Sequence, residues 1–113
     1  MMKIYLDSLG INYISQYRID DCRDVLPLPF DFYLIDSDYL LEVDGEGHFF
    51  PCYFHNCSRE KAEKTFKSTQ RHDGIKNSFC KNNNRKLIRI PYWEFQHEGY
   101  KQIITNLLKN NEL

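Results

Sequence analysis

The chain has 113 residues, of which 42% are hydrophobic and 15% aromatic, and its formal net charge is −1. This size leaves room for one domain with a modest core, and the composition excludes a disordered chain. No apolar run approaches the roughly 20 residues that a membrane-spanning helix needs, and no secretory signal is recognisable. We therefore expect an intracellular protein, cytoplasmic or, if encoded by a phage, in the host cytoplasm.

The first half of the chain predicts a short helix and then three strands. Apolar positions at helical spacing indicate the helix over residues 2–9, and Gly10 ends it. Residues 11–19 are rich in Ile and Tyr and alternate as a strand does, and the apolar runs 30–35 and 39–44 predict two further strands. Residues 20–24 predict a polar loop, and turn residues join the last two strands into a hairpin.

The second half predicts two helices around one strand. Ser58 is a typical helix cap, and a helical segment follows up to residue 81, with Gly74 as a break between two helices. Residues 86–90 predict a strand and residues 99–109 an amphipathic helix. The order α-β-β-β-α-β-α indicates an α/β fold with a mixed central sheet flanked by helices, formed by residues 1–113 as one domain.

Three carboxylates lie in the apolar strands of the predicted hairpin, where an unpaired charge is costly. Glu42 and Asp44 are two residues apart and therefore share one strand face. Asp31 lies between two phenylalanines and is expected to point away from both rings, so hairpin pairing brings it beside Glu42 or Asp44. Carboxylates that converge in this way repel one another unless a cation intervenes. The pattern predicts a Mg²⁺ or Mn²⁺ site for phosphodiester hydrolysis.

Further candidates lie nearby in the sequence. His48 follows Asp44 after a glycine-rich turn and is suited to act as a general base or to orient water. Asp73 and Lys76 are three residues apart on a predicted helix, where Asp73 can support the site and Lys76 can stabilise a phosphate. Structural alternatives remain open: a solvated strand end for Glu42 and Asp44, aromatic packing for His48, and an exposed ion pair for Asp73 and Lys76.

The charges are segregated along the chain. Residues 1–58 carry 3 Lys or Arg against 10 Asp or Glu, whereas residues 59–89 carry 10 against 3. An acidic half that holds cations beside a basic segment that holds phosphates would suit a nucleic-acid-binding protein. The candidate contacts to nucleic acid are Lys64, Lys67, Arg71 and Lys76. The alternative is an ordinary solvated helix face.

Three stretches together resemble a known family. The runs LPFDFYL, LLEVDGEGH and RHDGIKNSFCKNNNRKLIRIPYWEF are similar to the very-short-patch-repair-like endonucleases. These form a branch of the PD-(D/E)XK nuclease superfamily that includes phage homing-type endonucleases. The resemblance extends over roughly residues 10–96, and it implies a restriction-endonuclease-like fold and metal-dependent cleavage of DNA.

The resemblance also assigns roles to residues. It implies that Asp31 is a metal ligand and that Glu42 and Asp44 are the acidic pair of the following strand. His48 matches the family histidine, and Asp73 matches the later aspartate. Gln16 matches a strand glutamine near the scissile phosphate, although an ordinary surface amide is the alternative.

Two features depart from the family. The family glutamate of the first helix has no counterpart before Asp7, so either the site is incomplete or Asp7 or a second subunit replaces it. Homing-type relatives also carry separate DNA-reading modules, so specificity here would come from the chain's own loops or from a DNA-targeting partner. We therefore expect a Mg²⁺-dependent DNA endonuclease or nickase, alone or as a homodimer. The alternative is a catalytically weakened nucleic-acid-binding or assembly module.

Four cysteines occur, and an intracellular location predicts that they are free thiols. Cys52, His55 and Cys57 are close enough in sequence to suggest three ligands of a structural zinc ion, with Cys22 or Cys80 as the fourth. The resemblance also permits zinc at a comparable place. The spacing differs from standard zinc patterns, and unrelated buried thiols are the preferred interpretation.

Overall fold

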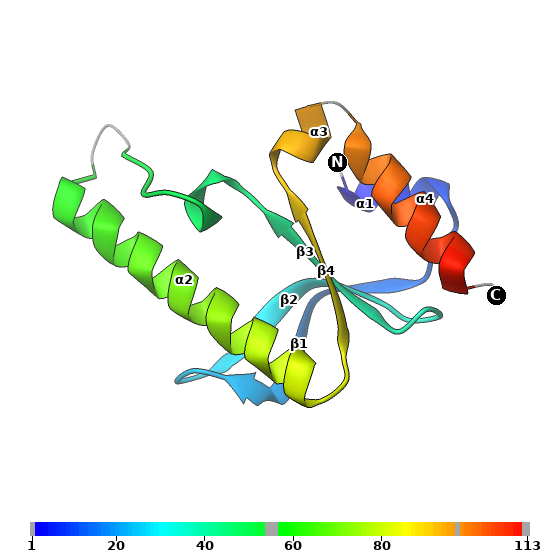
Figure 1. The fold of residues 1–113 in the computed structure, drawn as a ribbon, viewed down its shortest axis with the longest axis horizontal. Coiled ribbons are helices and arrows are strands. Elements are labelled where there is room, and N and C mark those ends of the chain that lie inside the picture. The colour runs from blue at the N-terminus through cyan, green and yellow to red at the C-terminus, as the bar shows by residue number, and fades with distance from the viewer. Residues whose placement is uncertain (1, 54–56, 97, 112–113) are drawn as a thin grey trace.

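The computed structural model describes residues 2–53, 57–96 and 98–111. These residues form a single sheet of four strands in the spatial order β1-β2-β3-β4, with helices on both of its faces (Figure 1). The strands are β1 (Tyr13–Arg23), β2 (Pro27–Leu34), β3 (Tyr39–Asp44) and β4 (Lys86–Pro91). Strands β1–β2 and β2–β3 pair antiparallel, whereas β3–β4 pair in parallel. The predicted α/β fold with a mixed, helix-flanked sheet is confirmed.

The helices separate into two layers around the sheet. Their bounds, with the short 3₁₀ helix η1 included, are α1 (Met2–Ser8), η1 (Glu46–His48), α2 (Arg59–Asn82), α3 (Trp93–Gln96) and α4 (Gly99–Asn111). Helices α1 and α4 cover one face, and α2 crosses the other (Figure 1). Within the described ranges no helix is long and apolar enough to cross a membrane.

Several element boundaries differ from the prediction. Strand β1 continues through most of the predicted polar loop because Cys22 is fully buried there, although its register with β2 shifts between Arg18 and Arg23. Helix α2 passes through Gly74 without a break. A glycine costs only about 1 kcal/mol in a helix interior, and the packing of Ile75 and Phe79 against the sheet offsets it. The short elements η1 and α3 were not predicted.

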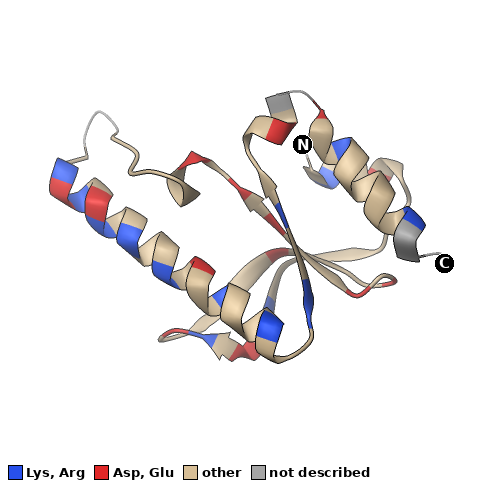
Figure 2. Cartoon of the chain, viewed as in Figure 1, with Lys and Arg blue, Asp and Glu red and all other residues tan. Residues whose placement is uncertain are grey.

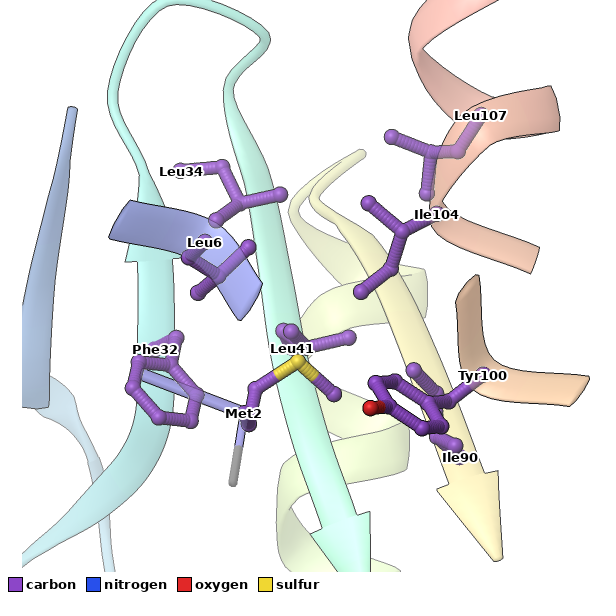
Figure 3. Packing of buried hydrophobic residues seen from close by; sticks show 9 residues of the cluster. All are labelled: Met2, Leu6, Phe32, Leu34, Leu41, Ile90, Tyr100, Ile104 and Leu107. Atoms are coloured by element: carbon purple, nitrogen blue, oxygen red, sulfur yellow. The ribbon is translucent and has the colours of Figure 1, made fainter. Parts of the chain in front are cut away.

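Two hydrophobic clusters hold the layers together. The larger one lies under α1 and α4, and Figure 3 shows its buried members: Met2, Leu6, Phe32, Leu34, Leu41, Ile90, Tyr100, Ile104 and Leu107. The smaller one lies under α2 and buries Cys22, Phe30, Leu40 and Cys80. All four cysteines are free thiols, as predicted.

In the β1–β2 hairpin, the side chains that point to one face of the sheet on one side of Asp31 point to the opposite face on the other side. Phe32 packs in the cluster under α1 and α4, yet Phe30, two residues earlier, packs under α2. Tyr13 and Tyr17 on β1 divide in the same way. Gln16 and Asp31 lie between the paired residues Ser15–Phe32 and Tyr17–Phe30, and Gln16 has a positive φ of 52°. The expectation that Asp31 points away from both neighbouring rings is therefore wrong, because those rings lie on opposite faces.

Candidate active site

Glu42 and Asp44 lie on the face of β3 that α2 covers. Their neighbours Leu41 and Val43 pack in the cluster on the opposite face, so the alternation of the strand directs both carboxylates toward α2. Only 2% of Glu42 and 5% of Asp44 is exposed. Figure 2 shows that Lys and Arg recur along α2, the helix on this side of the sheet. The solvated strand end considered from the sequence is therefore wrong.

Each of these carboxylates has a cation from the chain. The Lys76 Nζ donates to Glu42 Oε1 at 2.7 Å, and Lys76 is itself buried. The Arg89 Nη1 donates to both oxygens of Asp44, at 2.9 and 3.2 Å. The register of β3 with β4 places Arg89 opposite Glu42, so its guanidinium extends along the sheet toward Asp44. Arg89 was not among the candidate residues selected from the sequence.

His48 lies between two carboxylates. Its Nδ1 is 2.8 Å from Asp73 Oδ2 and 3.5 Å from Asp44 Oδ1. Arg89 contacts the same two aspartates, because its Nη1 is 3.5 Å from Asp73 Oδ1. The imidazole is 25% exposed, so solvent reaches it. The structure thus brings His48, Asp44 and Asp73 together, as the sequence suggested.

Burial dominates the protonation of Glu42. The pKa of its carboxyl group is raised from 4.5 to about 7. Loss of solvation is the largest cause, the hydrogen bond from Lys76 opposes it, and the charge of Asp31 adds to it. Asp31 is therefore close enough to Glu42 to act on it electrostatically.

The raised pKa of Glu42 predicts that stability falls as the pH rises from 4.5 to about 7. In that interval the folded protein holds a proton that the unfolded chain releases, which lowers the free energy of unfolding by at most about 1.4 kcal/mol per pH unit. Urea unfolding across this interval measures it. The variant Glu42→Gln is the control, and an identical pH dependence in both proteins would contradict the prediction.

Asp31 occupies a separate position from the ion pairs. The pairing of β2 with β3 ends at Phe32–Leu41, and the Asp31 Oδ2 accepts a hydrogen bond of 2.7 Å from the backbone N–H of Val43. Asp31 also lines an open pocket of about 380 Å³ together with Gln16, Lys3 and Ser15. The Asp31 carboxylate therefore takes the place of a backbone hydrogen bond between β2 and β3, at the point where the two strands separate.

The strained backbone of Gln16 lies beside this pocket. A positive φ in a residue other than glycine is uncommon inside a strand and costs on the order of 1–3 kcal/mol. Such strain often marks functional positions, and Gln16 and Asp31 line the same pocket. This proximity agrees with a shared role for the two residues.

The predicted magnesium ligands do not form a preformed metal site. Across residues 2–53, 57–96 and 98–111, no group of three or more His, Cys, Asp or Glu side chains is arranged to hold a metal ion. Asp31 binds a backbone N–H, Glu42 binds Lys76, and Asp44 binds Arg89. The expected convergence of three carboxylates on one cation is corrected accordingly: oxygen donors that suit Mg²⁺ are present, but the three side chains do not converge on one ion, and Glu42 and Asp44 are paired with cations of the chain.

Three of the four predicted nucleic-acid contacts are exposed on α2. Lys64, Lys67 and Arg71 recur at spacings that place them on one helix face, opposite the buried residues. Arg71 also forms an ion pair of 2.6 Å with Asp24 of the β1–β2 turn. Lys76 is 8% exposed and faces the sheet, so it does not belong to this surface.

The remaining candidates lie elsewhere. Asp7 is exposed and accepts a hydrogen bond of 2.9 Å from Tyr13, away from the ion pairs, so it does not replace the family glutamate. Cys52 and Cys57 line one small pocket beside α2. His55 lies outside the described residues. Cys22 and Cys80 are buried under the opposite half of α2 with Phe30, so neither serves as a fourth zinc ligand.

Comparison of the chain with protein-family models, with curated proteins and with solved structures finds no match. The function is therefore inferred from the geometry of the site.

Proposed function

We propose that this chain hydrolyses phosphodiester bonds in DNA as an endonuclease or nickase. The observation that carries the proposal is the His48–Asp73 pair, with 2.8 Å between Nδ1 and Oδ2. A carboxylate that accepts the Nδ1 proton fixes the tautomer in which Nε2 is basic. The partly exposed imidazole is then suited to remove a proton from water or return one to a leaving oxygen.

The neighbouring cation supports this chemistry. Arg89 is 22% exposed and contacts both aspartates around His48, so its guanidinium lies close to the position at which a phosphate would approach the imidazole. Fixed positive charge stabilises the charge that develops on a phosphoryl group in the transition state. No step is assigned to a metal ion. Magnesium or manganese stays a predicted cofactor, and Asp31 is its candidate ligand.

A plasmid-nicking assay tests the proposal. The wild-type protein should relax supercoiled DNA, and parallel reactions with Mg²⁺, Mn²⁺ or a chelator should show the predicted metal requirement. Asp73→Asn should slow nicking about tenfold or more, because the amide no longer enforces the correct tautomer. Asp36→Asn is the matched control, since Asp36 lies in the exposed β2–β3 turn. Equal rates for the two variants and the wild type would refute the assignment.

A second candidate function is nucleic-acid binding without cleavage. The pairing of Glu42 and Asp44 with the chain's own cations favours it, since both carboxylates are already neutralised. Binding of DNA that weakens with salt and with substitution of Lys64 and Lys67, without nicking under any metal condition, would support this function. A homodimer or a DNA-targeting partner stays a prediction under either candidate.

A further inference from the structure

We infer that Lys76 and Arg89 are built-in counter-cations of Glu42 and Asp44 and prevent these two carboxylates from binding divalent metal ions. Removal of the lysine charge should open a metal site at Glu42 that the wild-type protein lacks. This inference opposes the sequence expectation that both carboxylates are metal ligands. It does not depend on whether the chain cleaves DNA.

The first observation is the geometry at Glu42. Lys76 Nζ lies 2.7 Å from Glu42 Oε1, and Glu42 is 2% exposed. The ammonium group also lies 5.5 Å from the centre of the Phe30 ring, which favours a cation at this position. A metal ion bound to this oxygen would have to displace the ammonium group from its place. Mg²⁺ loses its water reluctantly and demands octahedral oxygen ligation at about 2.0–2.1 Å, which a closed site of this kind does not offer.

The second observation is the anchoring of Arg89. Its Nη1 binds both oxygens of Asp44, and its Nε donates to Asn77 Oδ1 at 2.9 Å. Its Nη2 donates to the Asp73 carbonyl oxygen at 3.4 Å. A guanidinium keeps its charge at any pH at which the protein is folded. Neither a change of pH nor a free rotation of the side chain would therefore release Asp44.

The local charges also oppose a divalent ion. Lys76 and Arg89 contact Glu42, Asp44 and Asp73, so two of these three negative charges are neutralised within the chain, while Asp31 adds a further negative charge near Glu42. His48 lies against the remaining acidic oxygens. A doubly charged ion added here would meet two fixed positive charges within the same cluster, which weakens its binding.

Binding of Mn²⁺, followed by paramagnetic broadening of amide resonances and by thermal unfolding, tests the inference. The wild-type protein should show no broadening and no change in unfolding midpoint that depends on Glu42 or Asp44. Lys76→Met should gain broadening centred on Glu42 and a higher midpoint in Mn²⁺. The double variant Lys76→Met with Glu42→Gln should lose both effects, and Lys81→Met, a change of an exposed lysine on the same helix, should bind Mn²⁺ no differently from the wild type.

Each outcome decides for or against the inference. Because Asp31 accepts a hydrogen bond from the Val43 N–H, an ion bound at either place would broaden residues 42–44, and the variants assign it. Wild-type broadening that is lost in Glu42→Gln or Asp44→Asn would overturn the inference, as would a folded Lys76→Met variant that gains no metal site. Wild-type broadening that is lost only in Asp31→Asn agrees with it. If Lys76→Met does not fold, Arg89→Met applies the same test at Asp44, with Asp44→Asn as the paired change, and the wild-type measurement still decides.

Discussion

Replacing His48 by glutamine is expected to lower the rate of DNA nicking by about 10²- to 10⁴-fold, the usual contribution of a general acid or base. Glutamine retains a polar side chain of similar length and can still bond to Asp73, so the fold should persist. It cannot accept and return a proton. The initial rate of plasmid relaxation, measured with saturating DNA, reports the loss.

The control for this variant is His72→Gln. His72 lies on α2 and contacts Asp24 at 3.1 Å, so it offers the same chemical change next to a carboxylate outside the cluster. Its nicking rate should stay within a few-fold of the wild-type rate. DNA affinity should be similar in both variants. If both variants lost activity equally, His48 would have no special role, and the acid–base assignment would have to be abandoned.

Replacing Leu41 by alanine is expected to lower the free energy of unfolding by about 2–5 kcal/mol. Leu41 is fully buried on a central strand, in the cluster between the sheet and helices α1 and α4. The truncation leaves a cavity among side chains from several elements, and packed helices collapse into such a cavity only in part. Equilibrium urea unfolding measures the change.

Ile4→Ala provides the comparison for Leu41. Ile4 lies on α1 and is 74% exposed, so its truncation removes little buried area. Its effect should stay within about 0.5 kcal/mol, as for most surface changes. A loss at position 41 no larger than the loss at position 4 would show that this cluster is not the core of the fold.

The sequence predicted an element correctly where one local signal, such as an apolar run, a helix-ending glycine or a long helical segment, was stronger than the others. Residues 39–44 form a short apolar-rich run bounded by turn residues, and β3 has these same bounds. Gly10 adopts a positive φ of 68° just after α1, as a helix-ending glycine should. The long helical segment made a parallel return the natural choice for residues 86–90, and β4 does pair in parallel with β3.

The boundaries that the sequence did not reveal depend on contacts between distant residues. The polar stretch after residue 19 favours a loop locally, but the burial of Cys22 against α2 holds it in β1. The glycine at position 74 suggests a break, but the sheet beneath α2 stabilises a continuous helix. Neither contact leaves a signal in the local pattern.

The site was predicted only partly, for the same reason. The shared face of Glu42 and Asp44 follows from strand geometry alone, and the proximity of His48 follows from the short glycine-rich turn. Arg89 required knowledge of the β3–β4 register. One signal for Arg89 was available in the sequence. An arginine within an apolar strand, like an aspartate within one, needs a partner of opposite charge. The direction of the Asp31 side chain relative to its two neighbouring rings was mispredicted because strict alternation fails there, although Asp31 does lie beside Glu42 as expected.

The change of face within the β1–β2 hairpin links the two sides of the molecule. One half of each strand packs under α1 and α4, and the other half packs under α2. A hairpin shared in this way joins two small clusters that would each be marginal alone. Neither helical layer can then melt while the other stays native, so the chain should unfold as a single cooperative unit despite having its apolar residues in two places.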